Sequence, residues 1–184
     1  MNHRHNVREL LRRLGEDPER GGLVETPERF IKAMEFYCSG YAVEKPEALL
    51  KVFEDGGDDC DEMILQKGIP VWSLCEHHLA PFFGVAHIAY IPKDGRIVGL
   101  SKLTRLVDVF MRRLQVQERL TTQIANTLAT HLSPCVGVQI VCRHSCMEAR
   151  GVQTSGTSTT SQALRGAFKT EPEARAEFLS AIRG

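Results

Sequence analysis

The stretch VAHIAYIPKDGRIVGLSKLTRLVDVFMRRL, residues 85–114, decides the fold class. Its first seven residues, 85–91, form an apolar β-like run that the turn-like sequence PKDGR closes. Apolar residues then recur at helical spacing, namely Leu103, Leu106, Val107, Phe110, Met111 and Leu114. The stretch therefore predicts a strand, a turn and a strongly amphipathic helix.

The flanking sequence extends this pattern in both directions. Apolar residues in one row predict a second helix over 116–128, which stops before Pro134. Residues 136–142 form a β run, and the sequence leaves open whether this run continues through residue 146. Short helices are expected near residues 6–14 and from Thr26-Pro27, and Pro172 opens a last helix. The chain is therefore predicted to be α+β, with two helices packed on one face of an antiparallel sheet.

The acidic segment EDGGDDCDE, residues 54–62, contains a Gly-Gly pair and is typical of a linker. We therefore expect an N-terminal helical segment with this linker over residues 1–62, and a second domain over 63–184.

Composition excludes some classes of function. The 184 residues carry 23 basic and 23 acidic side chains, whereas a general nucleic-acid binder normally has a large basic excess. A local cationic cluster for an anionic substrate is still compatible with zero net charge. No apolar run approaches the roughly 18 residues of a membrane span, and the polar N-terminus does not resemble a signal peptide. We therefore expect a cytoplasmic protein whose six cysteines are reduced.

Two short clusters combine cysteine with histidine. Cys75 and His78 have the C-x2-H spacing found in zinc sites. In the second cluster Cys142, His144 and Cys146 would share one face of a strand, so spacing alone does not decide which thiol binds. Taking the nearer thiol, Cys75, His78 and Cys146 would make a three-ligand zinc site with an open position, leaving His77 and His144 as acid/base groups. The alternative is core cysteines and surface histidines.

The start of the helix near residue 101 has the features of a phosphate site. Ser101 is placed as the N-cap, and Lys102 and Arg105 share a helix face beside the unpaired N–H groups. A capped, solvated helix face is the alternative. The Gln117-Glu118 pair is a further candidate, because a carboxylate in a pocket can accept two hydrogens from the edge of a guanine; here the alternative is an acidic residue at a helix start.

Five segments in one order bring these residues into a known pattern: CEHHLAPFFG (75–84), AYIPKDGRIVGLSKLTRLVDVF (89–110), RRLQVQERLTTQIA (112–125), RHSCMEARGV (143–152) and FKTEPEARAEFL (168–179). Together with TPER at 26–29, this series closely resembles the GTP cyclohydrolase I family. The resemblance covers most of the chain.

The resemblance implies an enzyme that converts GTP and water to 7,8-dihydroneopterin triphosphate and formate, the first step of pterin and folate-type biosynthesis. It implies one zinc ion per subunit, bound by Cys75, His78 and Cys146 and activating water. His77 and His144 match catalytic histidines, with His144 the principal proton donor. Glu118, with Gln117 beside it, matches the group that holds guanine. The triphosphate contacts it implies are Ser101, Lys102, Arg105, Arg150 and, from a neighbouring subunit, Arg29.

The resemblance also implies the tunnelling fold and a homodecamer of two pentamers, with active sites at subunit interfaces and neither nucleic acid nor membrane as a partner. Two alternatives are another tunnelling-fold purine or pterin enzyme and a structural-zinc binding module. The sequence leaves open the pathway that uses the product, the metal used in the cell and allosteric regulation. It also leaves open whether Glu148 faces the triphosphate or pairs with a cation across an interface.

Overall fold

The computed structural model describes residues 3–54 and 60–183, so residues 55–59 of the expected acidic linker lie outside the described residues. The chain forms two compact units, residues 1–39 and 40–184. The second unit thus begins at Gly40, before the boundary of 62 expected from the sequence. One reason is Arg113, whose guanidinium donates hydrogen bonds to the carbonyls of Gly40 and Val43.

The first unit is a pair of helices that contact each other, α1 (His3–Arg13) and α2 (Thr26–Tyr37). Both confirm helices predicted from apolar periodicity. Helix α2 begins at Thr26 with Pro27 in its first turn, so the capping position falls on Glu25 and not on Thr26. Proline is tolerated there because the first turn has no internal partner for its missing N–H.

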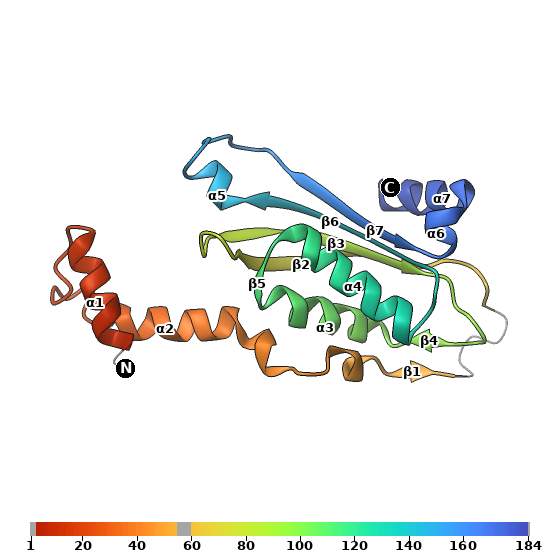
Figure 1. Cartoon of the computed structure of the whole chain (residues 1–184), viewed down its shortest axis with the longest axis horizontal. Helices are drawn as coiled ribbons and strands as arrows, with labels where there is room; N and C mark the ends of the chain where they lie inside the picture. Colours follow the sequence, from red (N-terminus) through yellow and green to blue (C-terminus); the bar gives the residue numbers. More distant parts are fainter. Residues whose placement is uncertain (1–2, 55–59, 184) are drawn as a thin grey trace. The chain divides into compact units, whose positions relative to one another are not determined.

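The second unit is built on a five-stranded sheet with the order β5-β2-β3-β6-β7 (Figure 1). Its long strands β2 (Ile64–Cys75), β3 (Pro81–Tyr90), β6 (Val136–His144) and β7 (Thr159–Arg165) pair antiparallel. The short edge strand β5 (Leu114–Gln115) runs parallel to β2. A separate two-stranded sheet joins β1 (Val52–Phe53) to β4 (Ile97–Val98), and short 3-10 turns, η1 (Ser39–Ala42) and η2 (Pro46–Leu49), precede β1.

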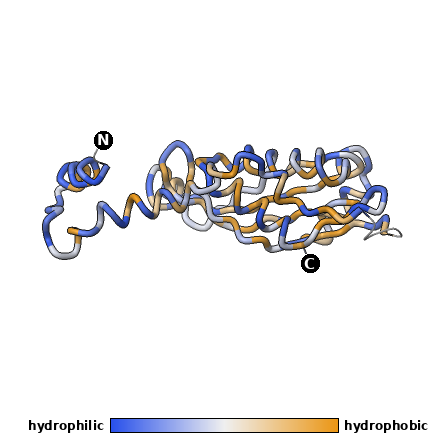
Figure 2. The backbone as a smooth tube through the Cα atoms, turned by 90° about the horizontal axis from the view of Figure 1, so that it is seen from below, coloured by the Kyte–Doolittle hydropathy of each residue, from blue (hydrophilic) through white to orange (hydrophobic). Residues whose placement is uncertain are grey.

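Two helices and the sheet enclose the main core. Helices α3 (Leu100–Met111) and α4 (Gln117–His131) contact each other, and both pack on the sheet. Along β3, alternate residues Phe82, Ala86, Ile88 and Tyr90 are buried in this core, as the two-residue period of a strand requires. Hydrophobic residues recur along the strands and helices of this unit (Figure 2). The predicted α3 and α4 are confirmed, as is the mixed helix-and-sheet class.

Residues on the opposite face of the sheet form a smaller core with the C-terminal helices. Ala89 packs with Phe168 of α6 (Ala167–Thr170) and Phe178 of α7 (Pro172–Arg183), which confirms the helix predicted to open at Pro172. Away from these helices, Trp72 is 60% exposed and stacks on Phe83. Within the described ranges, no helix combines the length and apolar character needed to cross a membrane.

Gly84 offers a test of the β3–β6 pairing that underlies the sheet. A Cβ atom at residue 84 would lie 1.9 Å from the carbonyl oxygen of Val141, which is backbone and cannot move aside. We expect Gly84→Ala to lower the free energy of unfolding by about 2 kcal/mol or more, measured by urea denaturation. Gly99→Ala is the control, because its Cβ would make only ordinary contacts. Equal stability of both variants would contradict this packing.

Candidate active site

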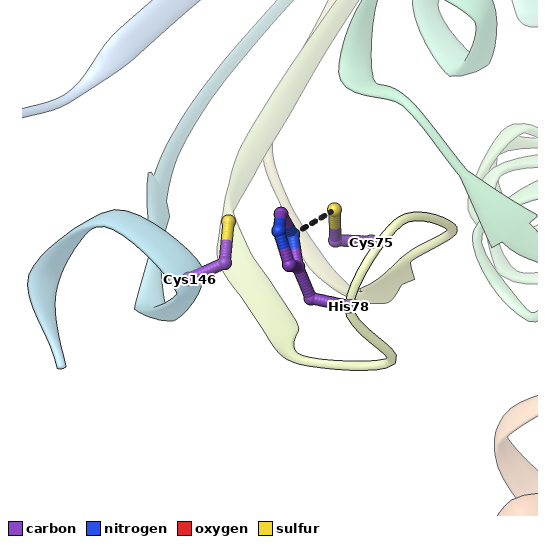
Figure 3. A group of neighbouring side chains, drawn as sticks. All are labelled: Cys75, His78 and Cys146. Atoms are coloured by element: carbon purple, nitrogen blue, oxygen red, sulfur yellow. Dashed lines mark hydrogen bonds between the residues drawn. The ribbon is translucent and has the colours of Figure 1, made fainter. Parts of the chain in front are cut away.

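Three side chains that could hold a metal ion converge at one end of the sheet (Figure 3). Cys75 ends β2, His78 lies in the turn that follows, and Cys146 belongs to the short helix α5 (Ser145–Glu148). One ligand atom from each residue lies within 4.8 Å of the other two. The predicted grouping of Cys75, His78 and Cys146 is therefore present in space.

The spacing of these atoms fits a tetrahedral metal ion. The Cys75 Sγ lies 3.6 Å from the His78 Nδ1. Zinc bonds of about 2.3 Å to sulfur and 2.0–2.1 Å to nitrogen, at a tetrahedral angle, place two such ligands about 3.6 Å apart. Two thiols and one imidazole could therefore hold a metal ion, and three protein ligands leave a fourth position for water or substrate.

The local structure around Cys146 differs from the extended strand considered from the sequence. Strand β6 ends at His144 and the chain turns into α5, where the Ser145 hydroxyl donates a hydrogen bond to the Pro81 carbonyl at 2.5 Å. Cys142, the alternative ligand, remains in β6 and is buried in the main core. The helical turn, and not a shared strand face, is what brings Cys146 to Cys75.

The segment that carries Cys75 and His78 is fixed to the start of α4. The Glu76 amide donates to the Gln115 carbonyl in β5 at 3.0 Å. The Glu76 carboxylate accepts two hydrogen bonds from Arg119, and this hydrogen bonding holds its pKa below the usual value. The Glu76 backbone and side chain therefore hold the turn between Cys75 and His78 against β5 and the first turn of α4.

The cluster faces a cavity of about 180 Å³. The residues that line it are Cys75, His77, His78, Phe82, Gln115, Val116, Gln117, Glu118, His144 and Cys146. The His144 ring stacks on Phe82, with centroids 4.9 Å apart. Burial lowers the pKa of His144, and the negative charges of Glu118 and Glu148 partly oppose this shift. A cluster that could hold a metal ion, a histidine with a perturbed pKa and a carboxylate thus share one cavity, as in catalytic sites.

The predicted histidines and guanine-binding residues occupy different environments in this cavity. His77 is exposed, and its Nδ1 lies 3.7 Å from the Cys75 Sγ. Glu118 is also exposed, at the second position of α4. Gln117 is only 1% exposed, and its amide is already hydrogen bonded to protein atoms. Glu118 is therefore available to a ligand in a way that Gln117 is not.

One predicted phosphate contact lies next to the cluster. The Arg150 guanidinium lies 3.3 Å from the Nε2 of His78. The open question about Glu148 has a clear answer in the fold, because Arg143 of the same chain binds its carboxylate through two hydrogen bonds of 2.8 and 2.7 Å. Glu148 therefore does not offer an uncompensated charge beside Arg150.

Three further phosphate candidates, Ser101, Lys102 and Arg105, lie toward the start of α3. Helix α3 starts at Leu100, so Ser101 lies in the first turn and is not the N-cap expected from the sequence; Gly99 is. The other end of α3 contacts β2 three residues before Cys75, where the Trp72 amide donates a hydrogen bond to the Met111 sulfur at 3.3 Å. Ten residues of helix, about 15 Å, separate Ser101 from Met111. Arg29 belongs to the first unit, where it pairs with Glu25.

The residues that support the site were not predicted from the sequence. Phe82 lies directly opposite His144 in the β3–β6 register, and Arg119 binds Glu76 across 43 positions of sequence. The two-residue period of β3 could have predicted that Phe82 is buried, because Phe82 shares a face with the core residues Ala86 and Ile88. Nothing in the local sequence pairs Arg119 with Glu76.

The environments of the cysteines predict selective chemistry. Burial raises the pKa of Cys142 to about 12, so almost no thiolate exists at pH 8. We expect iodoacetamide to leave Cys142 unmodified in the folded protein at pH 8 and to modify it in urea, as measured by peptide mass spectrometry. Equal rates of modification in both states would show that the thiol is not buried.

The chain is similar to known proteins over nearly its whole length. A model of the family GTP cyclohydrolase I matches residues 3–183. A protein of Janthinobacterium sp. named GTP cyclohydrolase 1 is 57% identical over 96% of this chain and 88% of its own length. Proteins of the same name from Nitrosospira multiformis and Caldanaerobacter subterraneus are 57% and 49% identical, over 93% and 96% of this chain and 89% and 93% of their own lengths. The chain is therefore an enzyme of the GTP cyclohydrolase I family.

Proposed function

We propose that this enzyme converts GTP and water to 7,8-dihydroneopterin triphosphate and formate, with zinc held by Cys75, His78 and Cys146. The observation that carries the proposal is the shared cavity, in which the ligand set faces both His144 and Glu118. Ring opening of guanine needs activated water, proton transfers and a fixed base, and these side chains can supply each of them in one place.

Each side chain has a distinct task in this reaction. When bound, zinc supplies Lewis-acid activation of water near neutral pH. His144 and His77 transfer protons at the imidazole ring of the purine. The exposed carboxylate of Glu118 accepts hydrogens from the guanine edge, the role that the resemblance also assigns to Gln117.

We further propose that the active site is completed by a second copy of the chain. The cavity of about 180 Å³ is smaller than the usual 300–1,000 Å³ of a ligand pocket, so it holds only the reacting part of GTP. Arg150 contacts the triphosphate of GTP from the same chain. A neighbouring chain contributes the other contacts, namely Ser101, Lys102, Arg105 and Arg29. For Ser101, Lys102 and Arg105, the distance along α3 from the end that contacts β2 supports this arrangement. The assembly we propose is the family's decamer of two pentamers, in which tunnelling-fold sheets close a barrel.

The six cysteines are free thiols in the structure. This supports a reducing compartment, and we place the enzyme in the cytoplasm.

Turnover of GTP with controlled metal content tests the reaction. Purified protein should release formate and yield a pterin that fluoresces after oxidation. Removal of the metal with a chelator should lower the rate at least about 100-fold, since a Lewis-acidic metal contributes several kcal/mol, and added zinc should restore it. Absence of formate release by the zinc-loaded protein would refute the proposed reaction.

The Cys146→Ser variant separates a catalytic metal from a structural one. Because Cys146 lies on α5 at the edge of the cavity, we expect loss of bound zinc and of activity, with the thermal unfolding midpoint and the assembly largely retained. Circular dichroism and size-exclusion chromatography measure the fold and assembly. Unfolding of the variant would instead support a structural zinc module.

A further inference from the structure

Gln117 occupies an unusual position for a polar side chain at the start of a helix. It is 1% exposed, and its amide bridges the strands β6 and β7. The Nε2 lies 2.9 Å from the Ile140 carbonyl, 2.9 Å from the Thr159 carbonyl and 3.0 Å from the Ser161 hydroxyl. The Oε1 lies 2.8 Å from the Nε2 of His144. Every polar atom of the amide therefore has a protein partner.

The hydrogens around Gln117 can be assigned from its partners. Thr121 donates its single hydroxyl hydrogen to the Gln117 backbone carbonyl at 2.7 Å. The Ser161 hydroxyl lies 2.6 Å from the Thr121 Oγ1, so Ser161 is the donor in that pair. The three groups facing the Gln117 Nε2 are consequently all acceptors. Rotating the amide by 180° would turn its oxygen against two carbonyl oxygens, so the nitrogen must face the strands.

This orientation fixes the hydrogen on His144. Because the amide oxygen can only accept, the Nε2 of His144 must carry a hydrogen. A neutral imidazole has one ring hydrogen, which leaves Nδ1 unprotonated. Among residues 3–54 and 60–183, no hydrogen-bond partner faces this Nδ1. Stacking on Phe82 holds the plane of the ring.

We propose that Gln117 is a positioning residue that locks His144 in the Nε2–H form, so that His144 exchanges protons with the substrate through Nδ1. This inference rests on the proposed function and deepens it. When His144 acts as an acid, the N–H bond at Nδ1 breaks, a bond to a substrate nitrogen forms, and the Nε2–H form remains. No proton passes through Gln117, since its amide oxygen only receives the hydrogen bond.

The proposal separates two roles for Gln117. If the amide contacted guanine, as the resemblance implies, its loss would weaken GTP binding and raise KM. Since both ends of the amide are used within the protein, we expect its loss to act on the chemical step instead. The split between kcat and KM therefore distinguishes a positioning residue from a substrate contact.

Steady-state kinetics of Gln117→Met is the first measurement. Methionine has a similar shape without the amide, and we expect kcat to fall roughly 100-fold, the size of a general acid–base contribution, with KM for GTP changed less than about 3-fold. Gln139→Met is the control, because Gln139 points to the face of β6 opposite to the one that bears His144. The kcat of this variant should stay close to wild type. A large rise in KM with unchanged kcat would overturn the proposal.

The form of the imidazole can be observed without turnover or a variant of Gln117. Solid-state NMR of protein labelled with 15N-histidine distinguishes protonated from unprotonated ring nitrogens, and the loss of one signal pair in His144→Asn assigns His144. We expect a protonated Nε2 and an unprotonated Nδ1 in the neutral ring. The opposite assignment would refute the proposal. A wild-type protein that releases no formate from GTP would refute the proposed reaction, while this spectrum would still decide the role of Gln117.

Discussion

The central physical constraint is that two distant segments of the sequence bring one ligand atom each of Cys75, His78 and Cys146 within 4.8 Å of one another, where they could hold a metal ion. The pairing of β3 between β2 and β6 satisfies it, because β2 ends at Cys75 on one side of β3, and β6 ends at His144, two residues before Cys146, on the other side. A register slip of one residue would move Phe82 and His144 to opposite faces of the sheet. The helix-covered core thus fixes the geometry of the metal site.

Assembling this cluster has an electrostatic cost that metal binding can offset. Burial, together with the neighbouring Cys75, raises the pKa of Cys146 and disfavours its thiolate. A divalent cation reverses this preference, since thiolate and neutral imidazole are its ligands. The ion pair between Glu76 and Arg119 and the Ser145–Pro81 hydrogen bond hold both ligand-bearing segments. The protein therefore places supporting contacts beside the residues that meet the metal.

Much of the fold and the metal cluster could be predicted from the sequence, because both depend on local patterns. Apolar periodicity predicted α3 and α4, and the C-x2-H spacing identified Cys75 and His78. The choice between Cys142 and Cys146 could not be made from spacing, since it depends on the turn into α5. The hydrogen-bond partners of Gln117 could not be predicted either, because they depend on the long-range pairing of β6 with β7, which no local pattern encodes.

X-ray absorption spectroscopy at the zinc edge tests whether Cys75, His78 and Cys146 hold the metal ion. We predict that zinc-loaded protein has two sulfur ligands at about 2.3 Å, and nitrogen or oxygen ligands at about 2.0–2.1 Å. It also predicts that Cys142→Ala leaves this spectrum unchanged, because Cys142 lies in the core. A zinc ion without two sulfur ligands, or loss of one sulfur in Cys142→Ala, would contradict the assignment of Cys75, His78 and Cys146 as the metal site.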